Sequence, residues 1–409
     1  DGPVPHADLK RAHVDIAIIG AGPAGAAAAT LLARAGREVT VFDRANFPRD
    51  KCCGDGLTAL ALRELEMLGL APATVGSWQP VDDVVIRSPS GREMRYPLPE
   101  GPGIHAAVAR REDLDNSLVD LARGAGADVR ESTPLRDAMA SIDGVELTVG
   151  DDEHFVARHV IAADGMWSPT RKALGLAIDG YRGEWHAFRQ YYRNVSPRAS
   201  RELVIWFEKD LLPGYAWSFP LADGRANIGF GIQRGGDNAV GAMNELWLDL
   251  LERPHIRDVL GPDAEPEDRH LAWPIPARVG RVPLVGPSTM FVGDAAAVTD
   301  PMTGEGIGQA LLTGRLAAEA ILHAADPEKS YEREVRCELV SDDRMARALI
   351  PLLGHPMITR GAIRLTGANG WTRRNFARWM FEDYPRAMIA TPRRWHRGMF
   401  TGSGAFAAE

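Results

Sequence analysis

The chain has 409 residues, of which 45% are hydrophobic and 25% are charged. This composition is typical of a soluble globular protein of two or three domains and excludes a disordered or fibrous chain. The net charge is −8, which argues against a dedicated nucleic-acid-binding protein, because such proteins need a basic binding surface. No apolar stretch reaches the roughly 18 residues of a membrane span, and the polar first ten residues lack the apolar core of a signal peptide.

Three cysteines, two of them adjacent at Cys52 and Cys53, do not make a disulfide framework, so we expect a reducing, cytoplasmic setting. The histidines are scattered without the spacing of metal ligands, and the sequence therefore predicts no metal site.

A strand, a glycine-rich turn, a helix and a second strand follow one another near the start of the chain. Residues 14–19 predict a buried strand, residues 26–35 a helix, and residues 38–42 a second strand. The turn after the first strand has the sequence Gly20-Ala21-Gly22-Pro23-Ala24-Gly25. In this context the motif is the fingerprint of a dinucleotide-binding unit.

The residues of this unit have separate predicted roles. Gly20 permits the tight turn, Gly22 lets the backbone approach a pyrophosphate, and Gly25 lets helix and strand pack closely. The start of the helix, around Ala24, supplies amide donors and the positive end of a dipole. At the end of the second strand, Asp43 can accept hydrogen bonds from ribose hydroxyls, and its neighbour Arg44 is expected to contact the same cofactor.

Two later strands distinguish FAD from NAD. Residues 160–163 predict a strand that ends at Asp164-Gly165, and residues 289–292 predict one that ends at Gly293-Asp294. A carboxylate in that position suits a ribityl hydroxyl. The turn that opens the next predicted helix, over residues 308–323, contains Pro301, Gly304, Gly306 and Ile307. Its amide donors suit the pyrimidine edge of an isoalloxazine, so the sequence predicts FAD.

Two longer segments carry a family resemblance. Residues 47–57 (FPRDKCCGDGL) and residues 212–220 (LPGYAWSFP), with ANIGFG at 226–231, resemble motifs of the geranylgeranyl reductase family. These FAD-dependent oxidoreductases have a para-hydroxybenzoate-hydroxylase-like fold and include menaquinone reductases. The resemblance covers about residues 13–325. It implies that Gly54 and Arg111 belong to the FAD site, with Arg111 placed over the cofactor.

The predicted fold class is α/β plus α+β, with a Rossmann-like FAD-binding domain, an inserted antiparallel-sheet substrate domain and a helical C-terminal region. The FAD-binding domain is expected in the segments 1–80, 106–175 and 281–325. The substrate domain is expected as a hairpin at 81–105 and an antiparallel sheet at 176–280, followed by a helical region at 326–409.

The resemblance implies a reductase that saturates a carbon–carbon double bond of an isoprenoid chain. Menaquinone side chains, geranylgeranyl diphosphate and prenyl lipids are the expected substrates. The reaction needs a hydride from the reduced flavin and a proton. The predicted substrate cavity is lined by Cys53, Asp55, Tyr215, Trp217 and Phe219. Candidate proton donors are Cys53, Tyr215 and Glu305, with Asp55 a further candidate, and the sequence does not rank them.

Two other functions fit the same fold: an FAD-dependent monooxygenase of aromatic or polyketide compounds, and a flavin-binding protein without turnover. No second GxGxxG motif follows a predicted strand, so no separate nicotinamide domain is expected. Electrons are therefore expected from NADPH that docks transiently, or from a ferredoxin-like protein or another reductase.

The C-terminal part has a distinct charge. Residues 341–400 contain eleven Arg, no Lys and four acidic residues, a net charge of +7, together with Trp371, Trp379 and Trp395. Aromatic and arginine side chains suit an anionic membrane surface or an acidic partner. Arginines paired with the acidic body would instead make the region a solvated helical appendage. The predicted location is thus cytoplasmic, with or without peripheral attachment to the cytoplasmic membrane.

Overall fold

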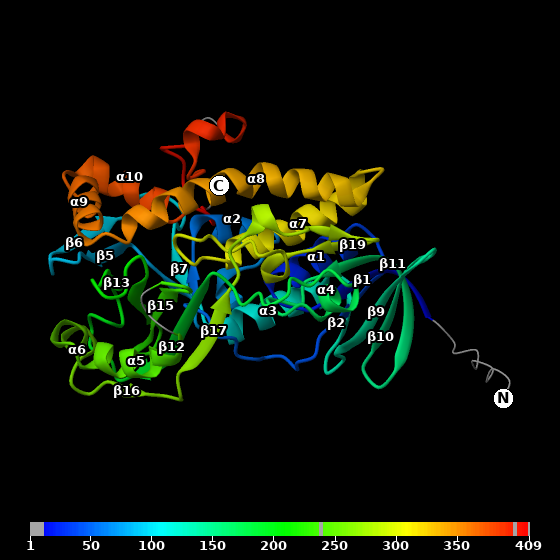
Figure 1. The fold of residues 1–409 in the computed structure, drawn as a ribbon, viewed down its shortest axis with the longest axis horizontal. Helices are drawn as coiled ribbons and strands as arrows, with labels where there is room; N and C mark the ends of the chain where they lie inside the picture. Colours follow the sequence, from blue (N-terminus) through cyan, green and yellow to red (C-terminus); the bar gives the residue numbers. More distant parts are fainter. Residues whose placement is uncertain (1–11, 237–239, 396–398, 408–409) are drawn as a thin grey trace.

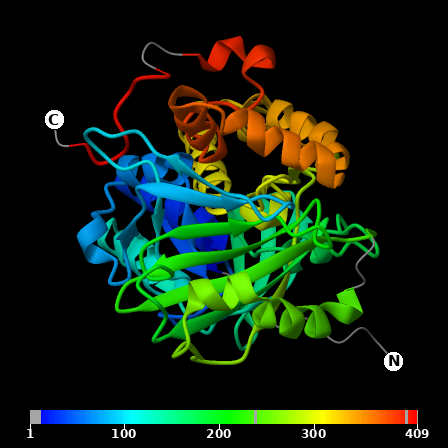
Figure 2. The same ribbon diagram turned by 90° about the vertical axis from the view of Figure 1, so that its left-hand side faces the viewer.

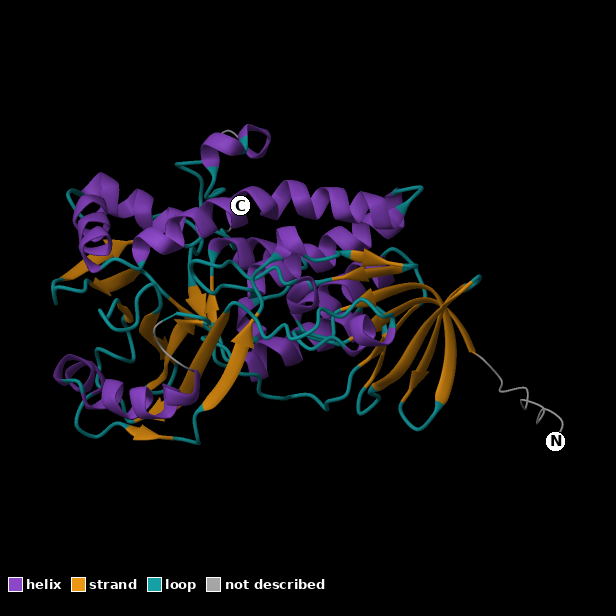
Figure 3. Cartoon of the chain, viewed as in Figure 1, coloured by secondary structure: helices purple, strands orange, loops and turns teal. Residues whose placement is uncertain are grey.

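The computed structural model describes residues 12–236, 240–395 and 399–407. The prediction about the first ten residues lies outside this part of the chain. Two large β-sheets lie toward opposite ends of the long axis, and a layer of helices runs along them (Figure 1 and Figure 3).

The first sheet has the strand order β18-β19-β11-β1-β2-β8, and β10 and β9 continue it from β11. Its strands are β1 (Ala12–Ile19), β2 (Val39–Phe42), β8 (Asp128–Arg130), β9 (Leu135–Ser141), β10 (Gly144–Val149), β11 (Glu153–Ala162), β18 (Val285–Gly286) and β19 (Thr289–Phe291). The central pairs β11–β1, β1–β2, β2–β8 and β11–β19 are parallel. This arrangement confirms the predicted Rossmann-like α/β fold.

Helices cover one face of this sheet. They are α1 (Pro23–Arg34), α3 (Arg111–Gly124), α7 (Ile307–His323) and α8 (Pro327–Leu353). Ile16 and Ile18 of β1 pack toward these helices, whereas Ala17 and Ile19 pack toward β10 and β11. Both faces of β1 are thus buried, as its apolar sequence predicts. The first helix starts three residues earlier than predicted, because proline is well tolerated at a first helical position.

The second sheet has the order β16-β12-β15-β14-β13-β5-β6, with β17 also paired to β12. Its strands are β5 (Asp83–Arg87), β6 (Glu93–Pro97), β12 (Trp185–Arg193), β13 (Leu203–Trp206), β14 (Tyr215–Leu221), β15 (Arg225–Gln233), β16 (Glu265–Pro266) and β17 (Leu271–Ile275). The pairs within 185–275 and within the hairpin of β5 and β6 are antiparallel, whereas the two segments join through a parallel pair, β13 with β5, in which Leu203 lies opposite Val84. No local turn joins these two strands, so no turn fixes their relative direction.

Smaller elements fill the space around the two sheets. They are α2 (Ala59–Met67), α4 (Pro169–Ala173), α5 (Met243–Glu252), α6 (Pro254–Leu260) and a three-stranded sheet of β3 (Gly56–Leu57), β7 (Ala107–Val108) and β4 (Gln79–Pro80). The β3 strand follows directly from the segment 47–57 that carries the family resemblance.

The C-terminal region is helical over much of its length. After α8, the helices α9 (Pro356–Thr366) and α10 (Gly370–Met380) lie at the end of the molecule that carries β5 and β6 (Figure 1 and Figure 2). Ile363 and Phe381 belong to the same buried cluster as Trp217 and Phe219 of the second sheet. The region is therefore packed against the body of the protein. Among the described helices, none combines the length and apolarity that a membrane span requires.

Candidate active site

A cavity of about 620 Å³ is lined by residues of both large sheets and of the loops between them. This volume lies within the range of small-molecule and cofactor sites. The predicted cofactor residues that line it are Gly20, Gly22, Ala24, Asp43, Arg44, Gly54, Arg111, Asp164, Gly165, Gly293, Asp294, Pro301, Gly304, Gly306 and Ile307. The predicted catalytic and substrate residues that line it are Cys53, Asp55, Tyr215, Trp217, Phe219 and Glu305.

Gly25 is the one predicted site residue that does not line the cavity. A Cβ atom there would lie 1.9 Å from the carbonyl oxygen of Gly20, so Gly25 acts by close packing inside the turn. Gly20 has a φ of +102°, and a Cβ atom on it would lie 2.4 Å from the carbonyl oxygen of Ala163. Gly22 caps α1 without a side-chain hydrogen bond. The first amides of α1 are therefore left to face a ligand at the cavity.

Asp43 and Asp164, two of the acidic residues predicted to bind the cofactor, differ in their hydrogen-bond partners. Asp43 accepts hydrogen bonds from the amides of Ala21 at 2.7 Å and Ala45 at 2.8 Å, so it also holds the glycine turn. Asp164 accepts one from Thr170 N at 2.8 Å through Oδ2, but its buried Oδ1 has no hydrogen-bond partner among the described residues. An unsatisfied acceptor in the cavity fits a hydroxyl donor of a bound cofactor. With the glycine turn, it makes the site compatible with FAD.

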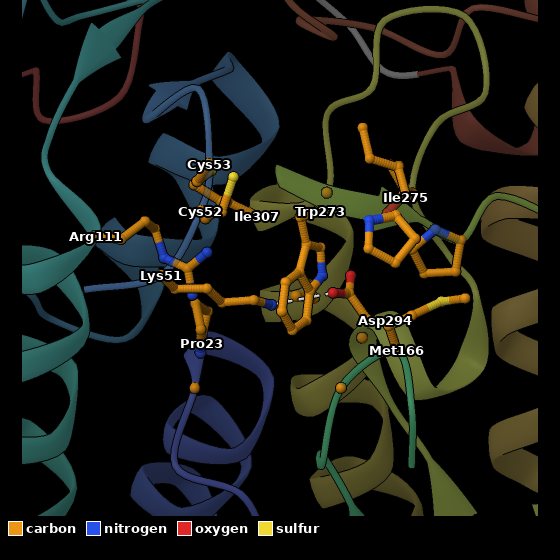
Figure 4. A pocket seen from close by; sticks show the side chains of 18 of the residues that line it. Pro23, Lys51, Cys52, Cys53, Arg111, Met166, Trp273, Ile275, Asp294 and Ile307 are labelled. Carbon is orange, nitrogen blue, oxygen red and sulfur yellow. Dashed lines mark hydrogen bonds and ion pairs between the residues drawn. The ribbon is translucent and has the colours of Figure 1, made fainter. Parts of the chain in front are cut away.

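The loop 47–57 is held by three ion pairs, each to a different part of the chain. The pairs join Arg49 to Asp115 (2.9 Å), Asp50 to Arg189 (2.6 Å) and Lys51 to Asp294 (3.0 Å). The first anchors the loop to α3, the second to β12 and the third to the segment after β19. Figure 4 shows the third pair across the cavity, with Lys51 reaching from one side to Asp294 on the other. The sequence analysis did not identify these contacts, although all three loop residues lie within the quoted motif.

Arg111 lies at the start of α3 and points into the same cavity (Figure 4). Its guanidinium donates two hydrogen bonds to the Asp115 carboxylate, at 2.8 and 2.7 Å. Burial opposes ionisation of Asp115, but Arg111 and Arg49 outweigh this effect and hold its pKa below the ordinary value. A fixed positive charge therefore stands at the cavity, where the family resemblance expects it.

Asp55 locks the loop onto the second sheet. It has a left-handed φ of +66° and is fully buried. Its Oδ2 accepts hydrogen bonds from Tyr191 Oη at 2.7 Å and Asn227 Nδ2 at 2.8 Å, and Asn227 Nδ2 also donates to the carbonyl of Cys53. Burial raises the pKa of Asp55 to about 6, although Arg189 opposes the shift. Through these hydrogen bonds Asp55 attaches the loop 47–57 to strands β12 and β15. Sequence reasoning missed both partners, although Asn227 lies in the quoted ANIGFG segment.

Aromatic side chains of β14 form a wall of the cavity. Every second residue of this strand is aromatic, so the side chains of Tyr215, Trp217 and Phe219 lie on the same strand face. The ring centroids of neighbouring pairs are 6.0 Å apart. The backbone of Gly54 packs on this wall, since a Cβ atom there would lie 3.5 Å from Phe219 and 3.6 Å from Trp217. The Tyr215 hydroxyl donates to the carbonyl oxygen of Thr303. Its proton is therefore directed at the backbone and away from the cavity.

The two adjacent cysteines are free thiols. Burial raises the pKa of Cys52 to about 12 and also raises the pKa of Cys53, despite the nearby Arg111. Both thiols therefore stay protonated and are weak acids at neutral pH. The Cys53 sulfur also accepts a hydrogen bond from the amide of Asp55 at 3.4 Å, which makes it part of the loop structure.

Glu305 is the candidate that best retains a transferable proton. Burial raises the pKa of its carboxyl to about 8, and repulsion from Glu382 adds to the shift. Its Oε1 atom lies 3.2 Å from the position of a Cβ atom on Gly56, and Phe219 lies equally close to that position. The carboxyl therefore sits beside the aromatic wall. Its side chain makes no hydrogen bond within the described part of the chain, so at neutral pH its proton is available.

The charge environment of Glu305 includes Asp300, Glu382 and Arg386. Glu382 and Arg386 follow α10, far along the chain from the predicted site. These two residues were not predicted, because no motif marks this segment. In the sequence, the region 341–400 is distinguished only by its high arginine content.

Comparison with known proteins agrees with this geometry. Residues 13–312 match the family model described as FAD binding domain. The chain is 38% identical over 334 residues to the menaquinone reductase of Mycolicibacterium smegmatis, covering 75% of this chain and 76% of that protein. It is 32% identical over 328 residues to digeranylgeranylglycerophospholipid reductase 1 of Methanopyrus kandleri, covering 77% and 82% of the two chains.

A solved structure has the same fold. The geranylgeranyl bacteriochlorophyll reductase-like protein of Thermoplasma acidophilum superposes with a TM-score of 0.71 at 21% identity, covering 90% of this chain and 100% of that one. The predicted family resemblance and the predicted cofactor are thereby confirmed. The chain belongs to the FAD-binding family that includes these menaquinone and digeranylgeranylglycerophospholipid reductases, and its cofactor is FAD.

Proposed function

We propose that the protein is an FAD-dependent reductase that saturates a carbon–carbon double bond of an isoprenoid chain. One observation carries this proposal: a single cavity joins the glycine turn of the FAD-binding fold to an aromatic wall, with the protonated Glu305 beside that wall. The names of both relatives specify a prenylated lipid, which supports the same substrate class. When bound and reduced, FAD supplies the hydride for such a reaction.

We propose distinct roles for the residues around the cavity. Tyr215, Trp217 and Phe219 hold the apolar chain and exclude water, which keeps the reacting carbon in a fixed orientation. Glu305 is the proposed catalytic acid and delivers its proton to the alkene carbon adjacent to the one that receives the hydride. Cys53 stays a second candidate because it lines the same cavity, and its buried thiol is the weaker acid.

The cofactor roles predicted from the sequence are proposals of the same kind. The glycine turn and the start of α1 would hold the pyrophosphate, and Asp164 would bind a hydroxyl through its unpartnered oxygen. The turn that contains Gly304 and Gly306 would hold the ring edge. Arg111 would keep a positive charge close to the cofactor, in the orientation that Asp115 fixes.

The substrate and the reaction are tested together by mass spectrometry. The FAD-loaded enzyme is incubated anaerobically with menaquinone, geranylgeranyl diphosphate or a geranylgeranylated lipid. The proposal predicts a product heavier by two hydrogens for at least one of the three. The alternative, an FAD-dependent monooxygenase, would instead require oxygen and add one oxygen atom to an aromatic or polyketide substrate. Absence of hydrogenated product with every isoprenoid would reject the proposal.

The electron donor is proposed to be NADPH or a ferredoxin-like protein or reductase. The two classes are separated by anaerobic reduction of the bound FAD, followed by its absorbance. Rapid bleaching by NADPH alone supports direct reduction, whereas bleaching only with a reduced protein donor supports the second route.

We also propose that the outer face of α9 and α10 contacts an anionic membrane surface. Thirteen large hydrophobic side chains are highly exposed in the described residues, and eight of them lie between Leu352 and Phe400. Met357 is 85% exposed, Leu365 is 73% exposed and Trp371 is 67% exposed. Exposed apolar groups of this number are typical of a binding surface.

Charge favours a lipid surface as the partner. From Leu352 to Arg374 the sequence contains four arginines and no acidic residue. Anionic lipids attract such segments by roughly 1 kcal/mol per cation, and the apolar side chains can enter the interface. Peripheral attachment to the cytoplasmic membrane would bring the enzyme to its lipid substrate.

Vesicle sedimentation tests this surface. The protein is expected to pellet with phosphatidylglycerol vesicles and to stay in the supernatant with phosphatidylcholine vesicles. The double variant Leu365→Ser and Trp371→Ser is expected to lose most binding, whereas Leu248→Ser, which alters a similarly exposed leucine on α5, is expected to retain it. Equal sedimentation of both variants would contradict the proposed surface.

A further inference from the structure

A second, smaller cavity of about 50 Å³ lies behind the turn that carries Glu305. Its polar lining residues are Thr299, Asp300, Gln309, Asp342, Asp343, Glu382, Tyr384, Arg386 and Arg394. Thr299 and Pro301 line both this cavity and the large one. A single short turn therefore separates the proposed substrate site from a polar compartment at the C-terminal region.

The turn is fixed to the C-terminal region by one buried arginine. Arg386 contacts Asp300 Oδ1 at 2.5 Å, Glu382 Oε1 at 3.4 Å and Thr303 Oγ1 at 3.3 Å. Asp300 in turn accepts hydrogen bonds from the amides of Met302 and Thr303 at 2.9 and 2.8 Å. These contacts fix the position of the turn at 300–306, which carries Glu305, relative to Glu382.

Glu382 is placed in the wall of the small cavity at some conformational cost. It has a left-handed φ of +59°, which a residue with a side chain rarely adopts. Its Oε2 accepts a hydrogen bond from Thr58 Oγ1 at 2.9 Å, and its Oε1 accepts one from Gln309 Nε2 at 2.6 Å. The start of α2 and helix α7 therefore both orient the carboxyl group of Glu382, which follows α10.

The small cavity also holds an unsatisfied polar atom. Gln309 is 3% exposed, and its Oε1 has no hydrogen-bond partner within the described residues. A buried acceptor of this kind calls for water, and a polar cavity needs only about 10–15 Å³ for each water molecule. The cavity thus has room for several. Asp342 and Arg394 also line the cavity, pair at 2.9 Å and are both partly exposed to solvent.

We propose that the small cavity and Glu382 form the route by which a proton from solvent reaches Glu305. The route starts at the Asp342–Arg394 pair, passes through water beside Gln309 to Glu382, and ends at Glu305 on the edge of the large cavity. Glu305 is the catalytic acid of the proposed function, on which this inference rests. Glu382 is a positioning and relay residue, because it lines the small cavity and not the large one.

The proton balance of the reaction requires that Glu305 regain a proton after each turnover. In each turnover the O–H bond of Glu305 breaks as a C–H bond forms, and the electron pair of the O–H bond stays on the carboxylate. Bound FAD, once reduced by the electron donor, would supply the two electrons of the reduction. Glu305 then accepts a proton from Glu382, and Glu382 accepts one from water. The apolar wall of Tyr215, Trp217 and Phe219 lies on the substrate side of Glu305, whereas the polar small cavity lies behind its turn.

The acidities of the two carboxyls suit this exchange. Burial raises the pKa of Glu305 to about 8 and that of Glu382 to about 7. Asp300 reinforces both shifts and Arg386 opposes both, while Asp342 adds to the shift of Glu382. Because burial raises the pKa of both carboxyls, both groups favour the protonated form, as a proton donor and its relay must.

Infrared spectroscopy of the oxidised, FAD-loaded enzyme tests the route without substrate. The carboxylic acid band that disappears in Glu305→Gln is assigned to Glu305, and its shift is followed after transfer into D₂O. The wild type is expected to exchange within the mixing time, and Glu382→Gln at least tenfold more slowly. Glu319→Gln, which removes an exposed acid of α7, is the matched control and is expected to exchange like the wild type.

Two further variants keep the test decisive. Glu382→Asp is expected to restore fast exchange, and Gln309→Leu, which removes the amide without deleting Glu382, is expected to slow it. Equal exchange rates in the wild type, Glu382→Gln and Gln309→Leu would overturn the route. Fast exchange together with the absence of any hydrogenated isoprenoid would reject the reductase and leave the proton route standing, so the two failures are distinguishable.

Discussion

Gly25 has no room for a side chain, because a Cβ atom there would lie 1.9 Å from a backbone oxygen of the same turn. Gly25→Ala is therefore expected to cost more than the roughly 1–3 kcal/mol of ordinary overpacking and to abolish FAD binding. Gly124→Ala is the control, since a Cβ atom at that helix end would contact nothing within 4 Å. Urea denaturation and bound FAD absorbance measure both effects. A Gly25→Ala protein that keeps its FAD and its stability would contradict the packing argument.

Glu305 should make stability depend on pH. Its pKa rises from an ordinary 4.5 to about 8 in the folded protein, so the fold favours the neutral acid. That contribution is complete below pH 4.5 and is lost as the pH rises to 8. At about 1.4 kcal/mol per pKa unit, the full loss amounts to roughly 5 kcal/mol.

Glu305→Gln replaces the neutral acid by a neutral amide and is expected to remove this part of the pH dependence. At pH 5 its free energy of unfolding should approach that of the wild type. At pH 8 it should exceed the wild-type value by a few kcal/mol, because the amide has no charged form whose burial destabilises the folded protein. Urea denaturation at both pH values gives the difference. Parallel pH profiles of the two proteins would contradict the assigned acidity.

Single residues differ in how well the sequence predicts them. Gly20 and Gly22 follow from the sequence because their role depends on a local turn with a strand before it and a helix after it. Asp55 illustrates the limit: the sequence places it at the cavity, yet its partners Tyr191 and Asn227 come from two other strands. Contacts of that kind depend on tertiary packing, which no local pattern encodes.

At the scale of elements, the loop 47–57 depends on its ion pairs for its position over the cavity. Arg189 of β12 is fully buried, pairs with Asp50 and stacks on the Tyr191 ring at 4.0 Å. Arg189→Ala is expected to cost about 3 kcal/mol, the lower end of the range for breaking a buried pair, and to weaken FAD binding.

The same strand offers a matched control. Arg193 also lies on β12 and pairs with Glu265, but both side chains are largely exposed. Arg193→Ala is expected to cost less than about 1 kcal/mol and to leave FAD binding unchanged. Chemical denaturation and FAD titration of the two variants give the comparison. Equal losses in both would show that the buried pair does not position the loop.

Elements follow from the sequence more reliably than their pairing does. Helix α7 starts one residue before its predicted position and strand β19 ends one residue early, because hydrophobic periodicity marks both. The parallel pairing of β13 with β5 was not predicted, since these strands are more than a hundred residues apart. The division of the chain into an FAD-binding domain, a substrate domain and a C-terminal region stays a prediction.

At the scale of the whole molecule, residues from distant parts of the chain surround one cavity. The glycine turn, the loop 47–57, the β14 wall and the turn at 300–306 all contribute to it. The C-terminal region then adds Glu382 and Arg386 behind that turn. No sequence motif marks this last contribution. It links the helices with the exposed apolar face to the acid beside the substrate site.

In the proposed reaction, reduced FAD bound in this cavity would transfer its electrons to an isoprenoid double bond. The most direct measurement is an anaerobic single turnover, in which stoichiometrically reduced enzyme is mixed with menaquinone or a geranylgeranylated lipid. The absorbance of oxidised FAD should return at the rate at which the double bond disappears, with one bond saturated for each FAD oxidised. Flavin that stays reduced in the presence of every isoprenoid, and reoxidises only when oxygen is admitted, would contradict the account.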